Sequence, residues 1–215
     1  MEEFIEVYLD NTFQTASLSR MYHSVFKLLP AGINNFNVWF GGGCYVRTLL
    51  NEKIADIDFF SSDRTELAQL VKLLRKSGYK LYFSNKNAIK GYIENKFGRI
   101  NIDIVKLIFP NEIETIRHFD FSVAKIVTNP KTNKCFYYSS VFVDIMQKRL
   151  ILPHKLPAPL GTLKRMQKYI KRGFSACDGT MLTLSKQLAE INFNDPVQNI
   201  IEFYPDGRQA IPLWD

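Results

Sequence analysis

The spacing of apolar and polar residues along the 215-residue chain switches repeatedly between helical and strand-like periods. Apolar side chains recur every three or four residues in segments such as 13–29 and 64–77, as in amphipathic helices. They alternate with polar residues in segments such as 55–60 and 99–109, as in strands with one buried face. We therefore predict helices at 13–29, 44–50, 64–77, 112–117, 141–148, 159–172 and 181–191, and strands at 37–40, 55–60, 81–83, 88–94, 99–109, 121–128 and 134–138.

The order of these elements predicts an α+β class, because mixed strands come first and helices follow. Pro159 stands near the first turn of the helix at 159–172, and Gly173 follows its end. Asp178 could cap the last helix. We expect a mixed β-sheet head with flanking helices in residues 1–157 and a short helical subdomain in residues 158–215.

Composition indicates a globular protein with an anionic partner. Hydrophobic residues make up 46% of the chain and charged residues 23%, which is ordinary for a folded domain. The net charge of +7 favours nucleic acid or a nucleotide as ligand. Cys44, Cys135 and Cys177 are far apart and form no CxxC, so neither a zinc site nor a disulfide framework is indicated. No signal peptide and no apolar run of about 20 residues is found, so we expect a cytoplasmic protein without membrane contact.

Two aspartates, Asp56 and Asp58, stand one residue apart in the predicted strand 55–60. Successive strand side chains point to opposite faces, so both carboxylates share one face while Ile57 and Phe59 face the core. Neighbouring carboxylates repel each other, and burial increases that cost. A bound Mg²⁺ or Mn²⁺ is the common remedy, since hard cations take carboxylate oxygens. The alternative is an exposed strand face on which both groups are solvated.

Three glycines, Gly41, Gly42 and Gly43, lie between a predicted strand and a predicted helix. A glycine-rich loop lets backbone N–H groups approach phosphate oxygens, and the following helix adds a favourable dipole. The alternative is a tight turn. Arg47 lies about one helical turn further on, where it could contact phosphate or form a salt bridge to a carboxylate of the sheet.

The combination of these motifs resembles the DNA polymerase β-like nucleotidyltransferase superfamily. Its signature is an apolar residue, two small residues, a spacer and Asp-apolar-Asp-apolar, which residues 40–43 and 56–59 match. Gly42–Gly43 is the preferred glycine pair, although Gly41–Gly42 also has an acceptable spacing. The superfamily usually adds a third carboxylate from a neighbouring strand. Asp103 is the best candidate because it points away from the isoleucine face of the strand 99–109. The alternative is that Asp103 is only a solvated residue at an edge of the sheet.

Within the superfamily, the chain is most similar to the head and neck of tRNA CCA-adding enzymes and bacterial poly(A) polymerases. The similarity covers roughly residues 36–174, through Val46–Arg47, FDFSVAKI at 119–126 and the helix at 163–174. It implies a palm-like head and a structural or nucleotide-positioning role for Asp120. The chain departs from the pattern at Ala124, where these enzymes have asparagine.

A strongly basic segment follows the last predicted strand. Residues 145–177 contain eight lysines and arginines and no acidic residue. Lys164, Lys168, Lys171 and Arg172 recur at helical spacing and share one face, and we expect this helix to contact triphosphate or RNA backbone, with Lys164, Arg165 and Lys168 as nucleotide-binding residues. The alternative is a solvated face. We expect Leu163, Met166 and Ile170 to form the packed stripe. Tyr169 and Phe174 could stack on a base or pack in the core.

The sequence therefore predicts a metal-dependent nucleotidyltransferase with Asp56, Asp58 and Asp103 as its catalytic carboxylates. It would transfer a nucleoside monophosphate from a nucleoside triphosphate to a hydroxyl acceptor, with RNA or tRNA favoured. No base-reading motif selects the nucleotide. Only 41 residues follow residue 174, which favours a small viral or mobile-element enzyme over a full tRNA-end enzyme. The alternative is a weakly active or inactive nucleotidyltransferase-fold protein that serves as a binding or structural component.

Overall fold

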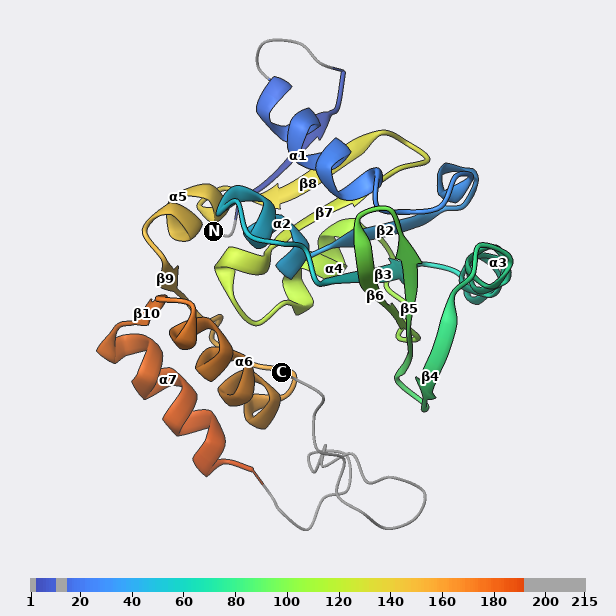
Figure 1. The fold of residues 1–215 in the computed structure, drawn as a ribbon. Helices are drawn as coiled ribbons and strands as arrows, with labels where there is room; N and C mark the ends of the chain where they lie inside the picture. The colour runs from blue at the N-terminus through green and yellow to red at the C-terminus, as the bar shows by residue number, and fades with distance from the viewer. Residues whose placement is uncertain (1–2, 11–14, 192–215) are drawn as a thin grey trace.

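A mixed eight-stranded sheet forms the centre of the molecule (Figure 1). The computed structural model describes residues 3–10 and 15–191. The strand order is β1-β8-β7-β2-β3-β6-β5-β4, and all neighbours are antiparallel except β3 and β6. The strands are β1 (Phe4–Tyr8), β2 (Val38–Gly41), β3 (Asp56–Ser61), β4 (Lys80–Ser84), β5 (Ala88–Asn95), β6 (Gly98–Val105), β7 (Ile126–Asn129) and β8 (Lys134–Tyr138).

Helices flank this sheet and continue beyond it, which confirms the predicted α+β class. They are α1 (Ala16–Phe26), α2 (Gly43–Leu49), α3 (Arg64–Lys76), α4 (Glu112–His118), α5 (Val141–Met146), α6 (Pro159–Lys171) and α7 (Asp178–Ala189). Two 3₁₀ turns, η1 (Ile33–Asn35) and η2 (Ser122–Ala124), complete the head. Among the residues that the structure describes, no helix is long and apolar enough to cross a membrane.

The two faces of the sheet carry different cores, and the strand alternation decides which residues enter each. Ile57 and Phe59 of β3 are fully buried in the larger core, together with side chains of α1, α2 and α3. On the opposite face, Trp39 and Phe60 pack under α4 in a smaller core. The Trp39 indole Nε1–H donates to Thr115 Oγ1 at 2.8 Å, which satisfies a buried donor. Asp56 and Asp58 lie on this second face, beyond the smaller core.

The structure differs from the local predictions at several places. Helix α1 covers Ala16–Phe26 of the predicted 13–29, of which residues 13–14 lie outside the described ranges. Strand β1 was not expected; it pairs with β8 at the edge of the sheet. Strand β6 ends at Val105 rather than at residue 109, because its partner β5 begins opposite Val105 at Ala88. Residues 122–124 form a 3₁₀ turn instead of extending the strand that becomes β7. Helix α7 begins at Asp178 itself after Cys177, so Asp178 is a first-turn residue and not the cap.

The basic C-terminal segment forms a small helical unit. Strand β9 (Arg149–Leu150) pairs in parallel with β10 (Ser175–Ala176), and α6 lies between them in the sequence. The Thr180 hydroxyl of α7 donates to the Leu150 carbonyl oxygen at 2.9 Å and ties α7 to the same small sheet. We propose residues 1–157 and 158–215 as the two domains. The described part of the second contains α6, β10 and α7.

Candidate active site

One row of residues crosses four strands of the sheet at the second face. In the strand register, Gly41 of β2 pairs with Asp58 of β3, Asp58 with Asp103 of β6, and Asp103 with Lys90 of β5. Residues paired across neighbouring strands share a face. Asp56 lies two residues before Asp58 and therefore on the same face. The fold brings the three sequence-predicted carboxylates together beside the first glycine.

A side chain would have a different effect at each of the three glycines. A Cβ on Gly41 would lie 2.1 Å from the Ile126 carbonyl oxygen, so β7 admits no side chain there. Gly42 has φ +76°, a conformation that side chains disfavour, and its N–H donates to Ile126 O at 2.9 Å. Gly43 begins α2, and no atom lies within 4 Å of an added Cβ. The space beside Gly43 therefore allows a ligand to approach the loop backbone.

Three cations approach two of the carboxylates. Lys90 Nζ lies 3.0 Å from Asp103 Oδ2. Lys168 Nζ of α6 and Arg47 Nε of α2 each lie 3.8 Å from a carboxylate oxygen of Asp56. Asp58 makes no ion pair with any side chain in the described ranges 3–10 and 15–191. The central carboxylate of the row is therefore the one whose charge is not directly paired.

The pKa values of Asp58 and Asp103 are raised, because the positive charge near them only partly offsets their burial and mutual repulsion. Burial, and then the charges of Asp103 and Asp56, raise the pKa of Asp58 to about 8, although Lys90 and Lys168 oppose the shift. Burial also raises the pKa of Asp103, and Lys90 again opposes the shift. A negative charge on Asp58 is thus disfavoured, because the position is buried beside two other carboxylates and has too few protein cations.

The donor set fits a hard divalent ion such as Mg²⁺. Its oxygens all come from carboxylates, and the unpaired charge of Asp58 would be relieved by a cation. The side chains are not yet arranged around such an ion: in the described ranges, no three acidic, histidine or cysteine side chains form a ready metal-ligand cluster. Asp56 and Asp103 are instead paired with Lys168 and Lys90.

Lys90 is a site residue that the sequence reasoning missed. The signal was present in the β5–β6 hairpin, where Asn95 pairs with Gly98 across a two-residue turn. Counting back from that turn places Lys90 opposite Asp103. The sequence analysis predicts 88–94 and 99–109 as strands without a register between them, which is why it does not include Lys90.

Arg47 forms a salt bridge to a carboxylate of the sheet, which is the second of the two roles considered from the sequence. It lies 3.4 Å from Glu52 as well as 3.8 Å from Asp56, and its side chain is 19% exposed. Glu52 also accepts from Arg172 Nη2 at 2.8 Å. Arg47 therefore belongs to an ion-pair network between α2, β3 and the end of α6, while its role toward phosphate stays a prediction.

The packed face of helix α6 differs from the one expected. Ile170 is 48% exposed, so its assignment to the packed stripe was wrong; the buried residues are Thr162, Met166 and Tyr169. Tyr169 is only 7% exposed and packs edge-on against Phe121 and Phe174. Tyr169 and Phe174 are therefore core residues and offer no free face to a base.

Asp120 and Arg165 join the head to α6. Asp120 is 6% exposed, and Arg165 Nε donates to its Oδ2 at 2.5 Å. Lys164, the neighbouring cation on α6, is exposed. Asp120 thus has a structural partner, which matches the structural alternative of the sequence analysis.

We expect Arg165→Gln to lower the free energy of unfolding by about 1–3 kcal/mol, because it leaves the buried Asp120 carboxylate without its partner. Urea unfolding of the nucleotide-free protein measures this loss. Lys164→Gln is the matched control on the same helix and should change stability by less than about 0.5 kcal/mol. Equal effects of the two substitutions would contradict a docking role for the Asp120–Arg165 pair.

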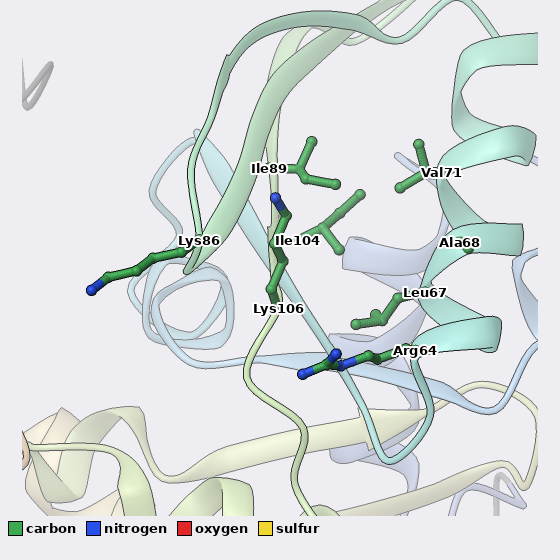
Figure 2. Close-up of a pocket in the computed structure, with 8 residues that line it drawn as sticks. All are labelled: Arg64, Leu67, Ala68, Val71, Lys86, Ile89, Ile104 and Lys106. Carbon is green, nitrogen blue, oxygen red and sulfur yellow. The ribbon is translucent and has the colours of Figure 1, made fainter. Parts of the chain in front are cut away.

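A separate cavity lies on the opposite face of the sheet. Figure 2 shows it between α3 and the strands β5 and β6. Its volume is about 340 Å³. Ile104 lines it, and Ile104 points away from the face of Asp103, its neighbour in β6. This cavity is therefore not part of the candidate site. Its lining residues are Arg64, Leu67, Ala68, Val71, Lys86, Ile89, Ile104 and Lys106.

Solved structures of CCA-adding enzymes are similar to this chain in fold. An apo CCA-adding enzyme matches with a TM-score of 0.55 and 18% identity over 86% of this chain and 46% of that one. A CCA-adding enzyme in complex with ATP matches with a TM-score of 0.54, 16% identity and coverages of 86% and 47%. The Thermotoga maritima CCA-adding enzyme in complex with tRNA matches with a TM-score of 0.51 and 18% identity over 88% of this chain and 47% of that one. The chain thus spans about half the length of these enzymes, and the likeness establishes the nucleotidyltransferase fold.

Sequence comparisons add one family match. A family model described as "Gabija anti-defense 2 family protein" matches residues 2–149, which includes the glycine loop and all three aspartates. No curated protein matches the chain significantly.

Proposed function

This chain belongs to the Gabija anti-defense 2 family, and on that premise we propose that it is a metal-dependent nucleotidyltransferase. It transfers a nucleoside monophosphate from a nucleoside triphosphate to a hydroxyl acceptor, with RNA as the favoured acceptor class. The observation that carries the proposal is the row Gly41–Asp58–Asp103 across three adjacent strands, with the open position at Gly43 beside it. An anti-defense family is also consistent with an origin in a virus or mobile element.

The metal would be held by Asp56, Asp58 and Asp103. A bound Mg²⁺ would neutralise phosphate charge and polarise the phosphorus under attack. The unpaired charge and raised pKa of Asp58 support this assignment, because a carboxylate in that environment is stabilised by a nearby cation.

The remaining steps belong to residues of the chain. The backbone beside Gly42 and Gly43 receives the triphosphate, since no side chain fills the space at Gly43. Asp103 accepts the proton of the acceptor hydroxyl, and Lys90, 3.0 Å away, holds that carboxylate in orientation. The acceptor oxygen bonds to the α-phosphorus, the bond from that phosphorus to the bridging oxygen breaks, and pyrophosphate leaves. Positioning and charge neutralisation supply most of the rate enhancement.

Helix α6 contributes positive charge from the other side. Lys168 lies against Asp56, and the exposed Lys164 is one turn earlier on the helix. We assign both to the triphosphate, for which a row of lysines supplies favourable charge. Relatives of the same fold have been solved with ATP and with tRNA, which supports a nucleotide and an RNA as the two substrates.

A second candidate function is a nucleotidyltransferase fold that binds without turnover. The ion pairs of Lys90 with Asp103 and of Lys168 with Asp56 favour it, because these lysines supply part of the charge that a metal would supply. In this reading the site would bind a nucleotide or a protein partner and release no pyrophosphate.

Thermal melts and label transfer separate the two candidates. Millimolar ATP with Mg²⁺ should raise the melting temperature by several degrees, as about 2.7 kcal/mol of stabilisation follows from ligand at 100 times its dissociation constant. Incubation with each α-labelled nucleoside triphosphate and total RNA should then transfer label to RNA. A melt shift without any label transfer would favour the binding function. Absence of both signals would refute nucleotidyl transfer and nucleotide binding at this site.

A further inference from the structure

Strand β4 and the β5–β6 hairpin form an extension at one end of the sheet, and α3 lies over part of the face opposite the aspartates. Strand β4 is the last strand in the sheet order (Figure 1). Four of its five residues are exposed. Leu81 and Tyr82 are each 43% exposed, and Phe97 in the β5–β6 turn is 39% exposed. Large apolar side chains at such an edge indicate an interaction surface.

Aromatic rings and cations alternate on the face of this extension that also carries the aspartates. The guanidinium carbon of Arg99 lies 3.9 Å from the centre of the Tyr92 ring, and Lys80 Nζ lies 5.6 Å from the same centre. The strand register places Lys80 opposite Tyr92, so all belong to one face. Tyr82 follows Lys80 by two residues, lies at the register shift between Leu81 and Phe83 and is 43% exposed. Burial and then the charge of Asp103 raise its pKa, while Lys90 and Arg99 oppose the rise.

The charge of the extension is positive. Residues 80–106 contain six lysines and arginines and two acidic residues, a net charge of +4. Both acidic residues are paired within the extension, Glu94 with Lys80 at 3.4 Å and Asp103 with Lys90 at 3.0 Å. The Lys80–Glu94 pair is exposed on both sides, 62% and 58%, so Lys80 can also reach an anionic partner.

The face of the extension is continuous with the candidate site. Tyr92 pairs with Asn101, and Asn101 pairs with Asp56 in the next strand. Lys90 and Asp103 form the neighbouring row. A chain lying along Tyr82 and Tyr92 would therefore bring its end to the carboxylates.

We propose that the β4–β5–β6 face binds a single-stranded polynucleotide, whose bases stack on Tyr92 and Tyr82 and whose phosphates contact Lys80 and Arg99. Unpaired bases offer π faces to tyrosine rings and to arginine planes, whereas a duplex hides them. An acidic peptide would match the charge but would leave the ring faces unused. The assignment of this strand as acceptor rests on the proposed function, whereas binding of the strand does not.

Fluorescence anisotropy of a labelled single-stranded oligoribonucleotide tests the proposal. A length of about 12 nucleotides falls within the site sizes of single-strand-binding folds. The assay is run without nucleoside triphosphate or Mg²⁺. Tyr92→Ala should weaken binding by about tenfold, since stacking on one aromatic ring typically supplies that much. Tyr92→Phe keeps the ring and should retain binding.

Tyr8 supplies the matched control. It is 57% exposed on β1, at the other edge of the sheet, and Lys134 Nζ lies 4.8 Å from its ring centre. Tyr8→Ala therefore removes a similar tyrosine–lysine pair away from the proposed platform and should leave RNA binding unchanged. Thermal melts of each variant confirm that the fold is retained.

The outcomes separate this proposal from the proposed function. Equal loss of binding in Tyr8→Ala and Tyr92→Ala, or equally tight and equally Tyr92-dependent binding of a blunt RNA duplex, would overturn the platform. Absence of single-strand binding together with an intact ATP-dependent melt shift would overturn the platform and leave the nucleotide site standing. RNA binding without an ATP-dependent melt shift would support the platform and count against nucleotidyl transfer.

Discussion

Asp58→Asn is expected to abolish nucleotidyl transfer and, in the same protein, to raise the melting temperature of the metal-free form. The substitution keeps the shape of the side chain and removes its charge. We expect about a 10²- to 10³-fold loss of transfer, a magnitude typical of removing one preorganised electrostatic contact from an active site. Stability and activity move in opposite directions because the charge that would hold the metal is costly without it.

The pH dependence of this stability difference has a defined sign. The pKa of Asp58 is raised from 3.8 to about 8 in the folded protein. Its unfolded form releases the proton more readily, so the wild-type protein loses stability as the pH rises from about 4 to about 8. Asp58→Asn lacks this loss, and its advantage should grow over that range and then level off. Each 1 kcal/mol corresponds to about 2–4 °C in melting temperature for a chain of this size.

Melting curves in EDTA between pH 5 and pH 9 measure the effect, and added Mg²⁺ should then stabilise the wild-type protein more than the variant. Glu6→Gln on β1 is the matched control, because Glu6 is an exposed carboxylate paired with Lys134 at the far edge of the sheet. Its curves should follow those of the wild type. A pH-independent difference for Asp58→Asn would contradict the electrostatic account of the row.

Alanine substitutions at the three glycines are expected to have three different results. Gly41→Ala places a Cβ 2.1 Å from Ile126 O and 2.8 Å from Val127 Cα, both backbone atoms of β7. Strand β7 would have to separate from β2, so we expect a loss of about 3 kcal/mol or more in the free energy of unfolding. Gly42→Ala meets only ordinary contacts with Phe119 but forces φ +76° and ψ −128° on an alanine. This backbone conformation lies outside the left-handed helical region and costs about 1–3 kcal/mol.

Gly43→Ala is the informative member of the series. No atom lies within 4 Å of the added methyl group, and alanine favours the helix that begins there, so stability should be unchanged or slightly higher. If the triphosphate lies over this backbone, the methyl group should raise the KM for nucleoside triphosphate by about tenfold, or 1.4 kcal/mol of lost binding. Urea unfolding and steady-state transfer assays measure the two effects. Full activity of Gly43→Ala would place the triphosphate elsewhere, and a wild-type melt for Gly41→Ala would contradict the β2–β7 register.

The motif residues could be placed from the sequence because their geometry follows from local periodicity. Alternation alone put Asp56 and Asp58 on one face and Ile57 and Phe59 on the other, and the structure confirms the burial of both apolar residues. The amphipathic pattern likewise gave α3, whose cap Asp63 accepts from the Thr65 N–H and whose end is followed by Gly78 at φ +89°.

Features that depend on long-range pairing were missed. Strand β1 is short, and its strand character depends on β8, more than 120 residues away. The three ion-pair partners of α6 in the head, Glu52, Asp56 and Asp120, could not be read from the helix itself. The predicted packed stripe of α6 includes Ile170, whereas the residue that is buried is Tyr169, one position earlier. Both side chains are largely apolar, and only tertiary contacts decide which one is buried.

The most direct test of the account is a crystal structure of the protein with Mn²⁺ and a non-hydrolysable nucleoside triphosphate, with anomalous diffraction to locate the ion. We predict an anomalous peak within coordination distance of Asp58 and at least one of Asp56 and Asp103, and triphosphate oxygens against the backbone of Gly42 and Gly43. The lysines now paired with Asp56 and Asp103 should move toward phosphate. An ion bound elsewhere, or a triphosphate bound away from the glycine loop while the three aspartates keep their lysine partners, would contradict the central claim.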